Sequence, residues 1–192
     1  TNDDFLHVVL AQQILAGDWP VRDFFDLGTW LSYGISATSQ VIFGHRLLAE
    51  AMVVAVMLAV STYLVFRLVH ELTGSTIAAV LAAVLLIVAG PRDYSYPKVI
   101  VYAVAATLWW WYVREPSVRR ILAFGAWVAA AFYWRGDHGV YVAAILALAV
   151  VAAHGISRTS VMRVVQAGAL AFALVTPVLV MIAATVGFGS VL

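Results

Sequence analysis

The residues best suited to chemistry in this 192-residue chain stand near its beginning, in the pattern Asp3-Asp4-x-x-His7. On a helix, His7 shares a face with both carboxylates, because residues three and four apart are neighbours there. Two adjacent carboxylates repel each other, so the pKa of one is expected to rise, which suits a general base. The same trio could instead hold a divalent cation such as Mg²⁺ or Mn²⁺. A third interpretation is that the acids only favour the start of a helix.

Further charged side chains fall in three short stretches beside long apolar segments, namely 17–25, 91–98 and 135–139. Such charges often only mark the ends of membrane spans, but they also commonly mark functional sites. An arginine there can clamp a phosphate or pyrophosphate through two parallel hydrogen bonds. Arg46 and Glu50, four residues apart, are interpreted as a neutralising pair. We therefore predict a site for an anionic ligand, whose candidate residues are His7, Arg22, Arg92, Lys98, Arg135, Asp137 and His138.

Apolar segments must position these loops. The first and the last of them reach the roughly 20 residues that a bilayer demands. The middle four are shorter, and Tyr, Trp, Gly and Arg at their ends extend them at the level of the headgroups. The sequence thus predicts an all-α transmembrane bundle of about six spans, at 47–66, 76–89, 99–113, 121–134, 140–153 and 164–186.

Residues 1–46 are more polar and are predicted to form an outer loop that carries its own helices. Residues 3–16 have a broad apolar side and predict an amphipathic helix. Residues 27–43 are half polar, which favours a short interfacial or re-entrant helix over a lipid-facing span. Residues 47–192 hold the transmembrane helices of the same single domain. We expect the chain to be a piece of a longer protein, with another span upstream.

Composition excludes several classes of protein. Hydrophobic residues make up 64% of the chain and charged residues 11%, whereas soluble domains are about half apolar and about a quarter charged. A lipid bilayer must therefore cover the surface. The net charge of +1 is too small to indicate a nucleic-acid partner. The sequence contains no cysteine, which excludes disulfides and thiolate metal sites.

The loops predict an orientation. Those at 67–75, 114–120 and 154–163 are short and mostly basic, so the positive-inside rule places them in the cytoplasm. The acidic stretch 1–46 and the loops at 91–98 and 135–139 then face the exterior. Arginine greatly outnumbers lysine, and Ala and Val are abundant, which is typical of a GC-rich bacterial genome. We expect a bacterial plasma membrane protein whose site faces the periplasm or exterior.

The N-terminal residues resemble a known superfamily. The acidic pair is followed by Ala-Gln-Gln-Ile-Leu-Ala-Gly-Asp-Trp-Pro-Val-Arg-Asp-Phe-Phe at 11–25, by Tyr33, and by Phe43-Gly44 before Arg46. This pattern is similar to the outer loop of the GT-C membrane glycosyltransferases, which include protein O-mannosyltransferases and lipid A aminoarabinose transferases. Over 47–192 the likeness consists mainly of the pattern of spans.

The resemblance implies an activity. A sugar would be transferred, with inversion at its anomeric carbon, from a polyprenyl phosphate or pyrophosphate donor to an acceptor of unspecified identity at the outer face. Asp3 would deprotonate the acceptor, and Asp4 would support it or help to hold a metal. Arg92, Lys98 and Arg135 would contact the donor phosphate. Members usually begin with a span before the acidic pair, which is the reason to expect a longer protein.

Two other functions remain alternatives at the level of sequence. A transporter or channel needs polar residues inside its spans to line a path, and the spans here consist mainly of Ala, Val and Leu. A structural or assembly subunit would not need acidic and basic loops gathered on one side. The enzyme hypothesis therefore accounts best for the charged loops.

Overall fold

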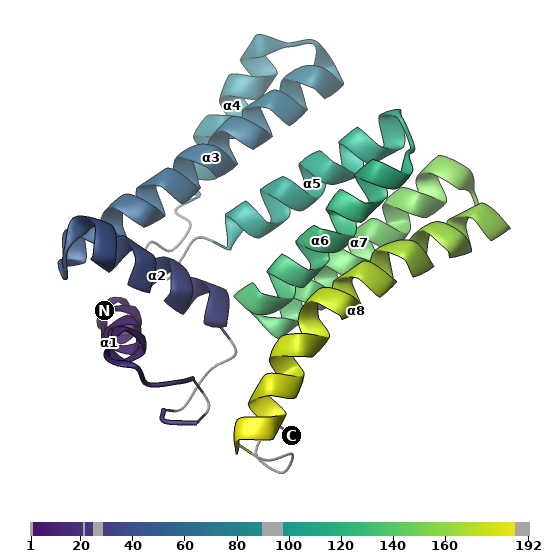
Figure 1. The fold of residues 1–192 in the computed structure, drawn as a ribbon. Coiled ribbons are helices and arrows are strands. Elements are labelled where there is room, and N and C mark those ends of the chain that lie inside the picture. Colours follow the sequence, from purple (N-terminus) through teal and green to yellow (C-terminus); the bar gives the residue numbers. More distant parts are fainter. Residues whose placement is uncertain (1, 21, 25–28, 90–97, 187–192) are drawn as a thin grey trace.

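The computed structural model describes residues 2–20, 22–24, 29–89 and 98–186, and helices make up most of this part of the chain. This confirms the predicted all-α class. Figure 1 shows the helices in chain order. They are α1 (Asn2–Ala16), α2 (Trp30–Phe43), α3 (Leu47–Thr73), α4 (Thr76–Val88), α5 (Val99–Arg114), α6 (Val118–Trp134), α7 (Gly136–His154) and α8 (Arg158–Val186).

Helices α3 to α8 run back and forth, so each is roughly antiparallel to the next (Figure 1). Helix α6 packs against α7 and α8, while α5 joins this group to the α3–α4 hairpin. We call the end that holds α1, α2 and the α6–α7 turn the α1 end. The turns after α3, α5 and α7 lie at the opposite end (Figure 1). This alternation agrees with the two sets of loops predicted from sequence.

Short capped turns make the antiparallel path possible. Gly74 ends α3 in the left-handed conformation (φ 67°), and its N–H donates to the carbonyl of His70. The next residue, Ser75, begins α4 by accepting a hydrogen bond from the N–H of Ala78. Glycine pays no steric cost at such a φ, and serine is a preferred N-cap. Two residues therefore suffice to reverse the chain.

All six predicted apolar segments form helices, and three of these are long and apolar enough to cross a membrane, at Leu47–Thr73, Gly136–His154 and Arg158–Ala184. Helices α4, α5 and α6 have 13, 16 and 17 residues. At about 1.5 Å per residue they extend roughly 20–26 Å, against about 30 Å of hydrocarbon. The chain is an integral membrane protein in which spanning helices are mixed with shorter apolar ones.

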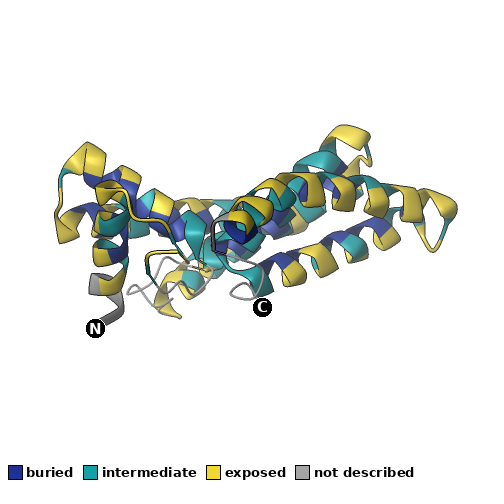
Figure 2. Ribbon diagram, turned by 60° about the horizontal axis from the view of Figure 1, so that its bottom comes forward, coloured by how far each residue is buried: buried dark blue, intermediate teal, exposed yellow. Residues whose placement is uncertain are grey.

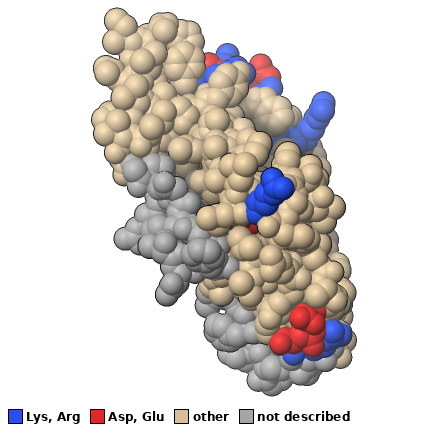
Figure 3. Space-filling model, turned by 90° about the vertical axis from the view of Figure 1, so that its left-hand side faces the viewer, with Lys and Arg blue, Asp and Glu red and all other residues tan. Residues whose placement is uncertain are grey.

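Large apolar side chains cover much of the surface. Ile77, Val88 and Phe172 are each more than 70% exposed, and exposed residues line the outer sides of α3, α4 and α8 (Figure 2). Figure 3 shows few charged side chains on the face that it draws, most of which is uncharged among the described residues. Water would penalise such a surface by about 25 cal/mol for each Å² of apolar area. Lipid therefore has to be its solvent.

Helix α2 reverses the usual arrangement of a soluble amphipathic helix. Its buried side includes Ser32, Ser36 and Gln40, whereas Val41 and Ile42 are 68% and 65% exposed. A helix with apolar residues outward and polar residues inward is stable beside lipid only if the polar groups find partners. The structure thus confirms a half-polar helix within 27–43 and shows that its polar side faces the protein.

Small residues allow α6 and α8 to approach closely. A Cβ added to Gly125 would lie 2.6 Å from the carbonyl oxygen of Ala167 and 2.9 Å from its Cα. Backbone atoms cannot move aside as the tip of a flexible side chain can. Contacts of this kind are typical of helix pairs in membranes, where van der Waals packing replaces the hydrophobic effect.

We predict that Gly125→Ala lowers the unfolding temperature of the protein in detergent, because overpacking costs about 1–3 kcal/mol. Gly168→Ala is the matched control, since an added Cβ there meets no atom within 4 Å. It should be neutral, or stabilising by up to about 1 kcal/mol from helix propensity. Equal shifts for the two variants would contradict the packing argument.

Candidate functional site

Helix α1 carries the acidic pair and the histidine that follows it. The helix begins at Asn2, so Asp3, Asp4 and His7 have the helical spacing that was predicted. The side chains of the two aspartates lie outside the described residues. The His7 side chain is half buried, and its ring centroid lies 5.8 Å from that of Tyr33 on α2. Contact with α2 thus fixes the inner side of α1.

Arg22 lies in the loop after α1 and pairs with its neighbour Asp23, at 2.6 Å between Nη2 and Oδ2. Asp23 also accepts a hydrogen bond from the N–H of Trp19. Hydrogen bonding to Arg22 holds the pKa of Asp23 below its ordinary value. Both side chains are substantially exposed. The described contacts of Arg22 are therefore local, and they organise the loop rather than join it to the other candidate residues.

Two of the predicted cations, Arg92 and Lys98, precede α5 in the sequence. Arg92 lies outside the described residues. Lys98 is the residue before α5 and is exposed. It lies within electrostatic range of His138, at the start of α7. Lys98 therefore belongs near the third predicted group, at the α6–α7 turn.

A single residue, Arg135, connects α6 to α7. Its extended backbone (φ −170°, ψ 137°) ends α6, and its N–H still donates to the carbonyl of Ala131. Its own carbonyl accepts from the N–H of His138 at 2.9 Å, which begins α7. The absence of a side chain at Gly139 permits this tight path, since a Cβ there would lie 2.8 Å from the Cβ of Phe132. The turn holds its charged residues on a well-defined backbone.

Arg135 and Asp137 form a two-point ion pair at this turn. Arg135 Nε donates to Oδ1 of Asp137 at 2.6 Å, and Nη2 donates to Oδ2. The hydrogen bonds to Asp137 raise the pKa of Arg135, so the guanidinium stays cationic. The two side chains are 41% and 38% exposed. These contacts use Nε and Nη2, and Nη1 can still donate to an anion.

His138 is buried beside this ion pair, with 4% of its surface exposed. Its Nδ1 lies 2.8 Å from the hydroxyl of Tyr102 on α5, and the two rings meet edge to face. Its Nε2 is buried and has no hydrogen-bond partner among the residues that the structure describes. If Tyr102 donates to Nδ1, Nε2 carries the proton. The N–H of this buried imidazole then has no acceptor among the described residues.

The structure thus brings Arg135, Asp137 and His138 together, with Lys98 close by. Tyr102 was missed by the sequence analysis. Tyr102 lies on α5 four residues after Lys98, which was the available signal, but nothing in the sequence points to its contact with a residue 36 positions away. Within the described side chains no group of three or more His, Asp or Glu residues lies close enough to hold a metal ion. The hypothesis of a metal site depends on Asp3 and Asp4, and the structure does not describe the side chains of these two residues.

A second group that the sequence did not reveal is a buried polar cluster between α2 and α3. Glu50 is 7% exposed and accepts hydrogen bonds from Ser36 and Gln40. Gln40 also donates to the carbonyl of Val8 in α1. The Ser36 hydroxyl lies 3.4 Å from the carbonyl of His7, which competes with Glu50 for its single proton. These contacts hold α1 against the bundle. Residue spacing along the sequence did not predict that Ser36 and Gln40 contact Glu50.

The α1–α2 unit and the α6–α7 turn lie at the same end of the bundle (Figure 1). The rings of Trp30 on α2 and Tyr133 on α6 lie 6.2 Å apart and connect the two groups. The candidate acids of α1 and the cations of the turn therefore share the α1 end.

Comparison with known proteins supplies the family. A family profile described as dolichyl-phosphate-mannose-protein mannosyltransferase matches residues 30–181, which include almost all of α2 to α8. No curated protein and no solved structure matches the chain significantly. The profile covers well over half of the chain. This chain therefore belongs to the dolichyl-phosphate-mannose-protein mannosyltransferase family, and its type is that of the GT-C membrane glycosyltransferases.

Proposed function

We propose that this chain is the membrane module of an inverting glycosyltransferase. It would move a sugar from a polyprenyl-phosphate-linked donor to an acceptor at the outer face of a bacterial plasma membrane. The observation that carries the proposal is the ion pair and buried histidine at the α6–α7 turn, in a member of this family. The acceptor and the sugar are left open.

The donor phosphate would bind at the α6–α7 turn. Lys98 and Arg135 supply two positive charges, and Asp137 supplies one negative charge, so the group favours an anion. The N-terminus of α7 adds its positive dipole end. Nη1 of Arg135 can donate to a phosphate oxygen, while His138, whose Nε2 is buried, supports the turn through its contact with Tyr102. The two cations would stabilise the negative charge that grows on the phosphate as it leaves.

The acceptor would be activated on α1. A carboxylate, assigned to Asp3, removes the proton from the acceptor hydroxyl, and the oxygen attacks the anomeric carbon of the sugar. The bond from this carbon to the phosphate oxygen breaks, and the polyprenyl phosphate leaves with the bonding electrons. One displacement inverts the anomeric centre. The contacts between α2 and the α1 backbone would keep the base in place.

Replacing Asp3 by Asn should abolish sugar transfer and leave the protein folded. The carboxamide cannot accept the proton, and loss of a general base costs about 10²–10⁴-fold in rate. Asp18→Asn, at an exposed acid in the loop after α1, should transfer at the normal rate. The assay is transfer from a polyprenyl-linked sugar by the full-length protein in reconstituted membranes. Normal turnover by Asp3→Asn would refute the assignment of the base.

Replacing Arg135 by Ala should raise the KM for the lipid-linked donor roughly 10-fold or more, because hydrogen bonds to charged groups contribute about 1.5–3 kcal/mol. Arg135→Lys keeps the positive charge, so its KM for the donor should lie between that of Arg135→Ala and that of the wild type. Arg158→Ala removes an exposed arginine at the opposite end and should leave KM unchanged. If Arg135→Ala alters only the unfolding temperature, the residue has a structural role and the donor site lies elsewhere.

The proposed orientation can be tested with single cysteines, because the chain has none of its own. Asp18→Cys lies in the loop at the α1 end, and Ile156→Cys replaces a residue that is 98% exposed at the opposite end. A membrane-impermeant maleimide added to intact cells should label position 18 and spare position 156. The reverse pattern would place the α1 end in the cytoplasm.

A further inference from the structure

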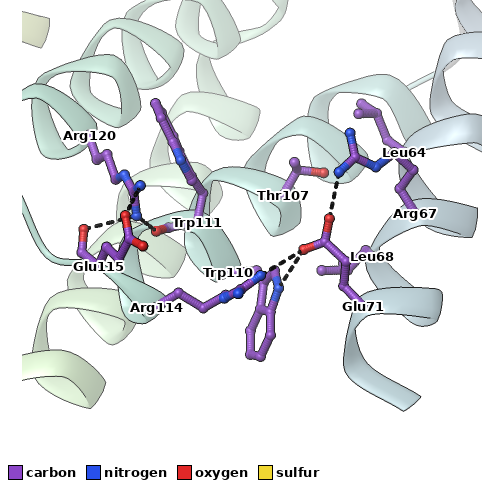
Figure 4. Close-up of a pocket in the computed structure, with 10 residues that line it drawn as sticks. All are labelled: Leu64, Arg67, Leu68, Glu71, Thr107, Trp110, Trp111, Arg114, Glu115 and Arg120. Atoms are coloured by element: carbon purple, nitrogen blue, oxygen red, sulfur yellow. Dashed lines mark hydrogen bonds and ion pairs between the residues drawn. The ribbon is translucent and has the colours of Figure 1, made fainter. Parts of the chain in front are cut away.

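A second polar site lies at the opposite end of the bundle, between α3 and α5. It is a cavity of about 430 Å³. Figure 4 shows its polar side chains converging from the two helices and from the start of α6. They include Arg67, Glu71, Trp110, Arg114, Glu115 and Arg120. The proposed glycosyl transfer uses none of these residues.

The cavity carries more positive than negative charge, with three arginines and two glutamates in its wall. Two of the arginines share one carboxylate. Glu71 accepts from Arg67 at 2.7 Å and from Arg114 at 3.3 Å, and it accepts a third hydrogen bond from Trp110 Nε1 at 3.0 Å. Arg67 and Arg114 are nevertheless 57% and 58% exposed. A single carboxylate therefore leaves a net positive charge between two accessible guanidinium groups.

The third arginine is already engaged. Arg120 pairs with Glu115, donates to the carbonyl of Trp111 at 2.7 Å and lies 4.7 Å above the Trp111 ring. It is only 17% exposed. These contacts close the α5–α6 turn, so Arg120 and Glu115 form a fixed wall. The available positive charge in the cavity is that of Arg67 and Arg114.

The remaining wall is suited to lipid. Leu64 and Leu68 line the cavity one helical turn apart, and Val60, one turn earlier on the same side of α3, is 41% exposed. Tryptophans such as Trp110 and Trp111 are typical of the layer where headgroups meet acyl chains. The cavity thus combines cations, interfacial aromatic rings and an apolar stripe that continues along a spanning helix.

We propose that this cavity binds the headgroup of an anionic phospholipid from the leaflet at the opposite end of the bundle. The phosphodiester lies between Arg67 and Arg114, and an acyl chain follows Leu68, Leu64 and Val60 along α3. Basic pockets between transmembrane helices recognise anionic headgroups in this way. The lipid joins α3 to α5 in addition to the bridge that Glu71 makes. Bound lipid therefore stabilises the contact between the α3–α4 hairpin and the rest of the bundle.

The test uses quenching of tryptophan fluorescence by brominated lipids. The protein is placed in phosphatidylcholine nanodiscs that contain increasing fractions of brominated phosphatidylglycerol or, in parallel, of brominated phosphatidylcholine. Saturable extra quenching by phosphatidylglycerol is expected. The variant Arg67→Gln/Arg114→Gln should lower the apparent affinity roughly 25-fold, at about 5-fold for each arginine near the membrane surface.

Two further variants make the result specific. Arg119→Gln/Arg158→Gln removes the same total charge from exposed positions at the same end but outside the cavity, so it should bind phosphatidylglycerol normally. Glu71→Gln removes the competing carboxylate and should increase the affinity. The expected affinity for phosphatidylglycerol falls in Arg67→Gln/Arg114→Gln and rises in Glu71→Gln. Unfolding of one variant cannot produce both changes. Unfolding temperatures of all variants are measured in parallel.

Three results would overturn the proposal. Equal quenching by the two brominated lipids would show that the cavity does not select anionic headgroups. Displacement of the brominated lipid by millimolar glycerol phosphate or inorganic phosphate would identify a site for a soluble phosphate. An increased KM for the lipid-linked sugar donor in Arg67→Gln/Arg114→Gln, in membranes of phosphatidylcholine alone, would assign the cavity to the donor.

Discussion

The buried carboxylate of Glu50 is the interaction on which the α1 end depends. A carboxylate taken out of water is costly unless hydrogen bonds replace its hydration. Here Ser36 and Gln40 of α2 donate to it, Gln40 also donates to the carbonyl of Val8 in α1, and the Ser36 hydroxyl lies beside the carbonyl of His7. Three helices therefore meet at one group of polar atoms. The polar side of α2 must face inward, and its apolar residues are left to meet lipid.

Further contacts connect α2 to α6 and α8 in the other half of the molecule. Trp30, at the start of α2, lies against the ring of Tyr133 on α6. The Tyr133 hydroxyl donates to the carbonyl of Leu174 on α8, one turn before Pro177, which has no N–H to continue the helix ladder. Figure 1 shows α8 bending in this second half. Through these two contacts Tyr133 connects α6 to both α2 and α8.

The sequence predicted the helices well because lipid demands long apolar runs, and such runs are visible without knowledge of tertiary contacts. It failed where polar groups meet across the fold. Tyr102 contacts His138 from another helix, and Glu50 accepts hydrogen bonds from Ser36 and Gln40 on α2. Residue spacing describes only neighbours on one element. The family profile covers residues 30–181, whereas the resemblance seen in the residues themselves was strongest over 3–46, so the two are largely complementary.

The shortness of α4 has a consequence for the surrounding bilayer. Its 13 residues extend about 20 Å, which is roughly 10 Å less than a membrane core of about 30 Å. A bilayer responds to a short helix by thinning locally, at a modest cost for each ångström. Where α4 crosses the bilayer, the lipids beside it would be compressed, whereas the 27 residues of α3 span the membrane core without thinning. Membranes with shorter acyl chains would match this part of the protein with less deformation.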